Sequence, residues 1–216
     1  MPTSLQIASV VAALGLGVTL GEYRSTPTSP TPAPTQESGQ EGQMPEGMSP
    51  EMMEEMAAWM RAGTPGEHHE LLDPMVGGWD AEVTLYLGPD MTEKSTGTMV
   101  NEWVFDGRYV VGTFEGSAMG QPFSGMSILA YDNAAQTYRG LWIDSMSTGF
   151  QQSAGYASED GKTWTFKTTT TDPVSGEPIA GKEEVVVESE DRHRMTAWYE
   201  EDGELVKSME IVYTRQ

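Results

Sequence analysis

From Gly78 onward, hydrophobic and polar residues alternate in short runs that a turn signal interrupts roughly every 9 to 14 residues. Ten such runs predict ten strands, over residues 78–87, 94–105, 108–117, 121–131, 137–146, 149–158, 163–171, 178–188, 191–200 and 204–214. Asp106-Gly107 and Asp202-Gly203 are typical two-residue hairpin turns. All connections are short, so consecutive strands should pair. The pattern predicts an all-β, roughly ten-stranded antiparallel up-and-down barrel with short N-terminal helices, a size that often holds one small ligand.

Alternation also assigns faces within each predicted strand, because successive side chains point to opposite sides. One face of the first strand carries Trp79, Ala81, Val83, Leu85 and Leu87. One face of the fifth carries Tyr138, Trp142, Asp144 and Met146. One face of the last carries Leu205, Met209, Ile211, Tyr213 and Arg215. The second strand is ambiguous, since Val100 and Val104 oppose Met99, Trp103 and Phe105. These faces predict an aromatic and methionine-rich interior.

The residues before the strands divide into segments of different composition. Residues 1–21 include an apolar stretch, residues 5–20, whose length suits the core of a signal peptide, although residues 1–4 carry no Lys or Arg. An uncleaved N-terminal membrane anchor is the alternative, and a buried element of the domain is a third reading. Residues 22–48 are rich in Pro, Ser and Thr and predict a disordered linker. We therefore expect an exported protein, periplasmic or tethered on the outer side of a membrane.

Residues 49–63 predict an amphipathic, methionine-rich helix. Ser49-Pro50 is a typical helix start, and Gly63 a typical stop. The apolar positions recur at helical spacing: Met52, Met53, Met56, Trp59 and Met60. We expect this helix to pack on its own barrel; gripping a partner or covering the barrel mouth is the alternative. Residues 64–216 form the predicted barrel domain, and a second short helix from Thr64 brings Leu71, Leu72, Met75 and Val76 to plug the closed end.

Charge and cysteine content exclude several kinds of partner and site. The net charge is -21, from 33 acidic and 12 basic side chains, so the surface repels phosphate backbones and argues against nucleic acid. The chain contains no cysteine, which excludes disulfides, thiolate metal sites and a cysteine nucleophile. There is also no P-loop, dinucleotide-binding fingerprint or G-x-S-x-G elbow.

Two resemblances follow from the motifs. Gly77-Gly78-Trp79 resembles the Gly-x-Trp that opens lipocalin-like barrels, in which the Trp closes the barrel base and a late Arg packs across it. Arg215 is the best-placed match for that Arg, with Arg192 and Arg194 as alternatives.

A second resemblance covers roughly residues 65–216. The blocks that carry it are His69-Glu70-Leu71-Leu72, Val76-Gly77-Gly78-Trp79-Asp80, Ser95-Thr96-Gly97-Thr98, Phe114-Glu115-Gly116, Gly120-Gln121-Pro122-Phe123, Tyr131-Asp132-Asn133, residues 142–149 and residues 209–215. Together they resemble a bacterial family, domain of unknown function 1579. The resemblance implies a calycin-like barrel, a class that carries lipids, haem or other apolar ligands. It implies no activity and no catalytic residues.

Four polar positions are candidates for chemistry. His69-Glu70-Leu71-Leu72-Asp73 approaches the H-E-x-x-H zinc motif, but Asp73 replaces the second His and no third ligand is near, so we expect no metal and a structural His69 at the barrel base. Asp144 shares a face with Trp142 and should point inward, where it would hold a ligand, act as an acid or base, or bond to turn amides. The carboxylate of Glu115 would have the same possible roles if it points inward. His193, if inward, could bind haem, as in nitric-oxide-binding calycins.

The cofactor is therefore unknown, with haem as a minor alternative, and the pattern does not define the oligomeric state. We expect a non-catalytic barrel that binds an apolar or amphipathic small molecule. The side chains expected to line the site are Trp103, Glu115, Phe123, Trp142, Asp144, Phe150, Trp164 and His193, and those expected to close the barrel are His69, Trp79 and Arg215. Two other functions stay open: an interaction module with a filled core, and an enzyme that uses convergent Asp144, Glu115, His69 or His193.

Overall fold

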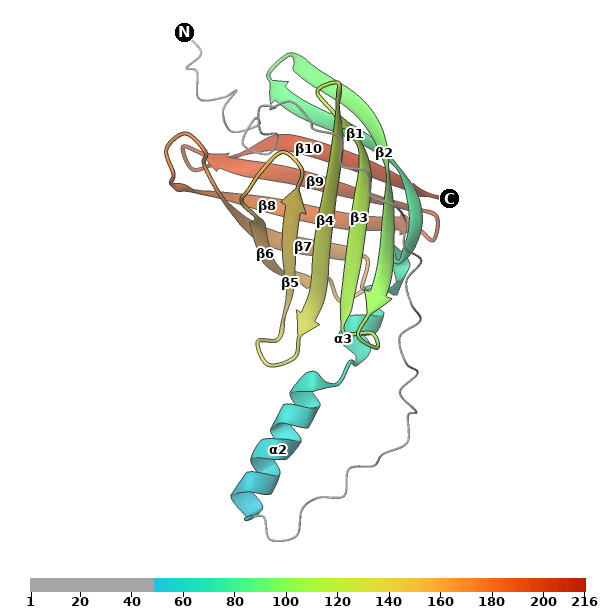
Figure 1. The fold of residues 1–216 in the computed structure, drawn as a ribbon, viewed down its shortest axis with the longest axis vertical. Helices are drawn as coiled ribbons and strands as arrows, with labels where there is room; N and C mark the ends of the chain where they lie inside the picture. The colour runs from blue at the N-terminus through green and yellow to red at the C-terminus, as the bar shows by residue number, and fades with distance from the viewer. Residues whose placement is uncertain (1–48) are drawn as a thin grey trace, which may run out of the picture.

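The computed structural model describes residues 49–216, and their strands form one closed barrel (Figure 1). The predictions for residues 1–21 and 22–48 lie outside these residues. The strands are β1 (Gly77–Gly88), β2 (Met91–Val104), β3 (Tyr109–Ala118), β4 (Gln121–Asp132), β5 (Thr137–Asp144), β6 (Gln151–Ala157), β7 (Thr163–Thr171), β8 (Pro178–Ser189), β9 (Arg192–Glu201) and β10 (Glu204–Arg215). Each pairs with its neighbours in sequence, all antiparallel, and this confirms the predicted ten-stranded up-and-down barrel.

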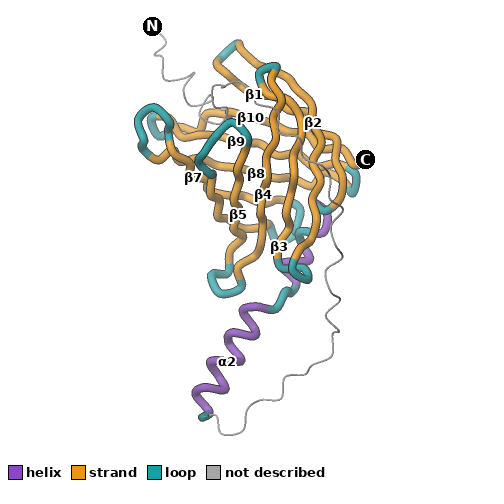
Figure 2. The backbone as a smooth tube through the Cα atoms, in the orientation of Figure 1, coloured by secondary structure: helices purple, strands orange, loops and turns teal. Residues whose placement is uncertain are grey.

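The first and last strands close the barrel on each other. β1 pairs with β10 from Trp79 opposite Arg215 to Leu85 opposite Met209. Closure gives each strand a partner on both sides, so the sheet has no edge strand. Figure 2 shows that the connections lie at the two ends of the barrel, where turns join successive strands.

Alternation predicts the inner face correctly in β1, and the structure resolves the ambiguity that alternation left in β2. Met99 is buried in the interior, whereas Val100 lies on the outer surface. In β10 the prediction fails at Leu205, which is 53% exposed. The pairing of β10 with β9 shifts register between Lys207 and Met209, and such a bulge changes which side chains face inward.

A short helical segment plugs one end of the barrel. It consists of α3 (Glu67–Glu70) and the 3₁₀ turn η1 (Asp73–Met75). Leu72 and Met75 from this segment are buried against side chains of the strands, including Val110, Tyr138, Trp164 and Phe166. The Met75 carbonyl accepts hydrogen bonds from Trp79 Nε1 (2.9 Å) and Asn101 Nδ2 (2.8 Å), which fix the plug to β1 and β2.

The methionine-rich helix α2 (Pro50–Gly63) projects away from the plugged end (Figure 1). None of its residues is buried, so the expectation that it packs on its own barrel is wrong, and it does not cover the end of the barrel opposite the plug. Only its end is attached: Arg108 Nε donates to the Gly63 carbonyl (3.0 Å) and Asn133 Nδ2 to the Thr64 carbonyl (2.8 Å). Thr64 caps this helix rather than starting α3, whose N-cap is Gly66.

Within residues 49–216, no helix combines the length and apolar character needed to cross a membrane. The same part of the chain holds no group of three or more His, Asp or Glu side chains placed to bind a metal ion.

Candidate functional site

A cavity of about 350 Å³ occupies the barrel interior. Its lining extends from Met75 on the plug to Phe150 in the β5–β6 connection at the opposite end. Several inward positions around it hold small residues, among them Ser127, Gly140, Ser153, Gly181 and Ala197. Closely packed interiors leave few voids larger than a water molecule. The small residues on β4 to β9 therefore explain why this barrel is hollow.

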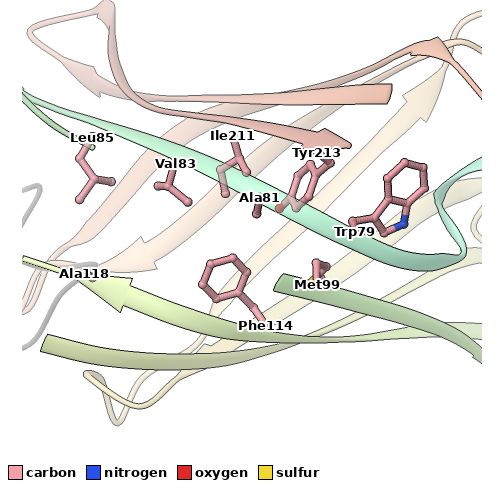
Figure 3. Close-up of a cluster of buried hydrophobic side chains, with 9 residues drawn as sticks. All are labelled: Trp79, Ala81, Val83, Leu85, Met99, Phe114, Ala118, Ile211 and Tyr213. Carbon is pink, nitrogen blue, oxygen red and sulfur yellow. The ribbon is translucent and has the colours of Figure 1, made fainter. Parts of the chain in front are cut away.

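One wall of the cavity is apolar. It comes from β1, β3 and β10, whose inward side chains include Val83, Leu85, Phe114, Ile211 and Met209. Figure 3 shows the first four of these, with Ala81 and Tyr213, gathered between the strands that carry them. This wall would contact an apolar ligand and remove its surface from water.

We call the opposite wall, from β6 to β8, the polar wall, because it carries polar side chains beside apolar ones such as Phe166 and Val185. It presents Gln151, Ser153, Thr168 and Glu183 to the cavity. Gln151 Nε2 donates a hydrogen bond of 2.7 Å to Glu183 Oε1. Burial raises the pKa of the Glu183 carboxyl, and the hydrogen bond from Gln151 opposes that shift only in part.

Sequence reasoning missed Glu183, because Lys182-Glu183-Glu184 resembles a solvated charged run. A signal was present: Gly181, Val185 and Val187 share the face of Glu183. Val186 on the opposite face obscured the alternation.

Asp144 lies near the end of the cavity opposite the plug, where it orders a turn and an aromatic ring. Its Oδ1 accepts from the Met146 amide (2.9 Å) and its Oδ2 from Trp142 Nε1 (3.2 Å). The Trp142 ring lies stacked on Phe123, with 6.3 Å between ring centroids, and over Gly125, where an added Cβ would collide with it. Of the roles open to Asp144, bonding to turn amides is the one this geometry supports; its carboxylate positions Trp142.

His193 faces inward near the plugged end and is 4% exposed. Its ring lies 4.3 Å from that of Trp79 and 4.5 Å from that of Tyr213, centroid to centroid, and its Nδ1 has no hydrogen-bond partner among residues 49–216. Burial, and then the charge of Arg215, lower the pKa of His193 to about 4, so the imidazole is neutral at pH 7.

The environment of His193 does not fit a haem ligand. An axial imidazole must present a ring nitrogen to a wide planar group. The His193 ring is almost fully covered, and Trp79 and Tyr213 lie directly against it. Haem binding at His193 would require these rings to move.

The side chains expected to line the site divide into two groups. Phe123, Trp142, Asp144, Phe150 and His193 line the cavity. Trp103, Trp164 and Glu115 do not, and these three assignments are corrected.

Each of these three residues has a physical reason for its place. The Trp103 indole donates to Asp73 Oδ1 (2.8 Å) beside the plug. Trp164 is fully buried in the plug cluster. Glu115 follows inward-facing Phe114 in β3, so it points outward and is exposed.

The residues expected to close the barrel meet at the plugged end. The Arg215 guanidinium lies 4.1 Å above the Trp79 ring, a cation–π contact, and donates to the carbonyls of Val76 (3.0 Å), Pro74 (3.3 Å) and Glu190 (2.9 Å). His69 is buried in α3, where its Nδ1 accepts a hydrogen bond of 3.2 Å from the Gly66 amide. Burial lowers the pKa of His69.

Solved structures similar to this one are barrels. Rv2717c from M. tuberculosis is 14% identical and superposes with a TM-score of 0.55, over 71% of this chain and 99% of that one. At that identity the likeness shows the fold alone. The S-type phycobiliprotein lyase CPES from Guillardia theta (14% identity, 73% and 96% of the chains, TM-score 0.47) and EF1p2_mFAP2b bound to DFHBI (14%, 69% and 100%, TM-score 0.39) are looser matches. No curated protein matches the chain.

A family model covers the whole folded barrel. Residues 64–215 match the model described as a protein of unknown function, DUF1579, which includes the plug, the ten strands and every cavity-lining residue. The match extends over more than half of the chain and agrees with the motifs seen in the sequence. The chain therefore belongs to the DUF1579 family.

Proposed function

We propose that this protein is a non-catalytic carrier or sensor that binds an apolar or amphipathic small molecule inside the barrel. The observation that carries the proposal is the cavity of about 350 Å³, which lies within the usual range for small-molecule pockets, about 300–1,000 Å³. One end of the barrel is plugged by α3 and η1. No helix among the described residues covers the other end, and we expect a ligand to enter there.

The cavity distinguishes this proposal from an interaction module with a filled core. In a filled barrel, large side chains from facing strands would meet at the centre. Here the inward positions at that level include Gly140, Ser153 and Gly181, and space remains between them. Unfilled volume lowers stability, so a hollow of this size is better explained by a ligand than by packing.

The four acid–base groups that the sequence suggested for an enzyme do not converge. Asp144 is engaged with its own turn, Glu115 faces outward, and His69 lies in the plug. His193 lies at the plugged end, with its ring covered by Trp79 and Tyr213. A general acid or base must reach the reacting atom within hydrogen-bonding distance, and these four side chains offer no common point for a substrate. Binding without chemistry is therefore the function that the geometry supports best.

We expect Ser153→Phe to weaken binding of the neutral fluorescent probe N-phenyl-1-naphthylamine at least about tenfold, because the new ring would occupy the cavity. Titration of the full-length protein, followed by probe fluorescence, measures the effect. The matched control is Gln152→Phe, which adds the same ring on the exposed outer side of β6. Equal affinity of both variants and the wild type would contradict binding inside the barrel, and so would a wild type that does not bind the probe.

A further inference from the structure

The polar wall of the cavity contains a carboxylate that the proposed function does not yet explain. Asp144 makes two hydrogen bonds with its own turn and with Trp142. Glu183 lies deeper, paired across the sheet with Phe166 on β7 and Ala197 on β9. Among the described residues its side chain makes one hydrogen bond, from the Gln151 amide. An amide is a neutral donor, so the charge of Glu183 is not balanced by that bond.

No basic side chain balances this charge from the surrounding strands. Lys182 lies on the outer surface, where its Nζ is 3.0 Å from Glu184 Oε2 and 4.8 Å from the centre of the Trp198 ring. Lys167 on β7 is exposed, between inward-facing Phe166 and Thr168. Arg215 and His193 lie at the plugged end, and among the described residues Glu183 takes part in no ion pair. Glu183 is thus an inward carboxylate without a cationic partner.

A carboxylate that faces a barrel interior without a cation nearby is costly, and such groups are usually paired or become protonated. Burial raises the pKa of Glu183, as this reasoning requires. Burial, and then the charge of Glu183, also raise the pKa of the Tyr213 phenol. A cation brought by a ligand would remove this cost.

We propose that Glu183, held by Gln151, binds the protonated amino group of an amphipathic amine whose apolar tail lies along the wall formed by β1, β3 and β10. This inference rests on the proposed function and names the ligand class for the same cavity. An ammonium group has three N–H donors. The second oxygen of Glu183, the amide oxygen of Gln151 and the hydroxyls of Ser153 and Thr168 line the same wall and offer acceptors for them.

The polar and apolar walls of the cavity lie on different strands, so they would contact the head group and the tail of such a ligand separately. The polar wall lies on β6 to β8 and the apolar wall on strands across the barrel, including Val83 on β1 and Phe114 on β3. A ligand with a carboxylate head would place two like charges together and should be rejected. The site therefore selects for the sign of the head group as well as for an apolar tail.

The test compares three ligands with the same tail: decylamine, decanol and decanoate. Each displaces N-phenyl-1-naphthylamine from the full-length protein at pH 7, where the amine is protonated. We expect decylamine to bind at least about tenfold more tightly than decanol, and decanoate to bind most weakly. In Glu183→Gln, the preference for decylamine over decanol should disappear, so that the two ligands bind with equal affinity.

The matched control is Glu184→Gln, which removes a carboxylate from the outer surface of the same strand. It should keep the preference for the amine. Equal affinity of the wild type for the amine and the alcohol would overturn the inference while leaving the binding function intact, and so would an amine preference that survives in Glu183→Gln. Failure of the wild type to bind the probe or any of the three ligands would instead overturn the proposed function.

A ligand-free measurement gives an independent outcome. Because the pKa of Glu183 is raised in the folded state, ionisation of this carboxyl disfavours folding at pH 7, and protonation relieves the cost as the pH falls toward the ordinary value of 4.5. Glu183→Gln should therefore raise the Tm at pH 7, with a smaller gain at acidic pH. A lower Tm would mean that Glu183 stabilises the empty barrel, and would remove the reason to expect a cationic ligand.

Discussion

Replacing Trp79 with alanine should lower the free energy of unfolding by about 3–5 kcal/mol. The indole is fully buried, and it contacts both the plug before β1 and the last strand, β10. Its Nε1 donates to the Met75 carbonyl on the plug, and its ring carries the guanidinium of Arg215 from the last strand. Alanine would leave a cavity beside His193 and remove the surface on which Arg215 lies.

Chemical denaturation of the full-length protein, with fluorescence and circular dichroism as probes, measures this loss. The matched control is Trp59→Ala on α2, where the ring is 74% exposed and should contribute little. Each variant lacks one tryptophan, so both lose fluorescence from one indole and their unfolding transitions can be compared directly. Equal stability of the two variants would show that Trp79 does not hold the plug to the barrel.

The second large effect is a dependence of stability on pH through His193. Its pKa is lowered from 6.5 to about 4 in the folded protein, first by burial and then by Arg215. The unfolded chain therefore takes up a proton before the folded chain does, and stability is lost as the pH falls from about 6.5 to about 4. At about 1.36 kcal/mol for each pKa unit, the loss amounts to roughly 3 kcal/mol.

His193→Phe should remove this loss, because phenylalanine keeps a ring between Trp79 and Tyr213 but does not titrate. The quantity to measure is the difference in unfolding free energy between the variant and the wild type at several pH values. It should grow in favour of the variant below pH 6.5. Glu183 contributes with the opposite sign in both proteins and cancels in the difference. A difference that stays constant from pH 7 to pH 4 would contradict a buried, neutral His193.

The sequence was sufficient to predict the architecture, because the barrel depends on features that are local in the chain. Hairpin turns such as Asp106-Gly107 and the short connections determine the order of the strands. Alternation in β1 identifies Trp79 to Leu85 as interior, and the late Arg215 meets Trp79 as the lipocalin resemblance implied. These signals need no knowledge of how distant strands are placed.

The site was predicted less well. Whether a residue lines the cavity depends on its level along the barrel axis as well as on whether its side chain points inward. Trp103 and Trp164 are interior residues, as their aromatic character suggests, but they lie in the plugged end, below the cavity. Glu183 lies at cavity height, yet its charged neighbours made it resemble surface. Strand registers decide which inward residues share a level, and the sequence alone did not define them.

Helix α2 shows a different limit of the sequence pattern. Its spacing predicts a helix with one apolar face, and the helix forms, with the Ser49 hydroxyl accepting a hydrogen bond from the Met52 amide. The pattern does not say what covers that face. In the structure nothing within residues 49–216 buries it, since hydrogen bonds from Arg108 and Asn133 attach only its C-terminal end to the barrel.

The central claim, that the barrel interior is the binding site, is tested most directly by NMR of the methionine methyl groups. Met99, Met195 and Met209 line the cavity, whereas Met52, Met53 and Met60 are exposed on α2 and serve as internal controls. On titration of the full-length protein with decylamine, we predict that the signals of the three cavity methionines shift and saturate together, while those of α2 stay in place. Shifts confined to the α2 methionines, or no shift at any methionine, would contradict a ligand site inside the barrel.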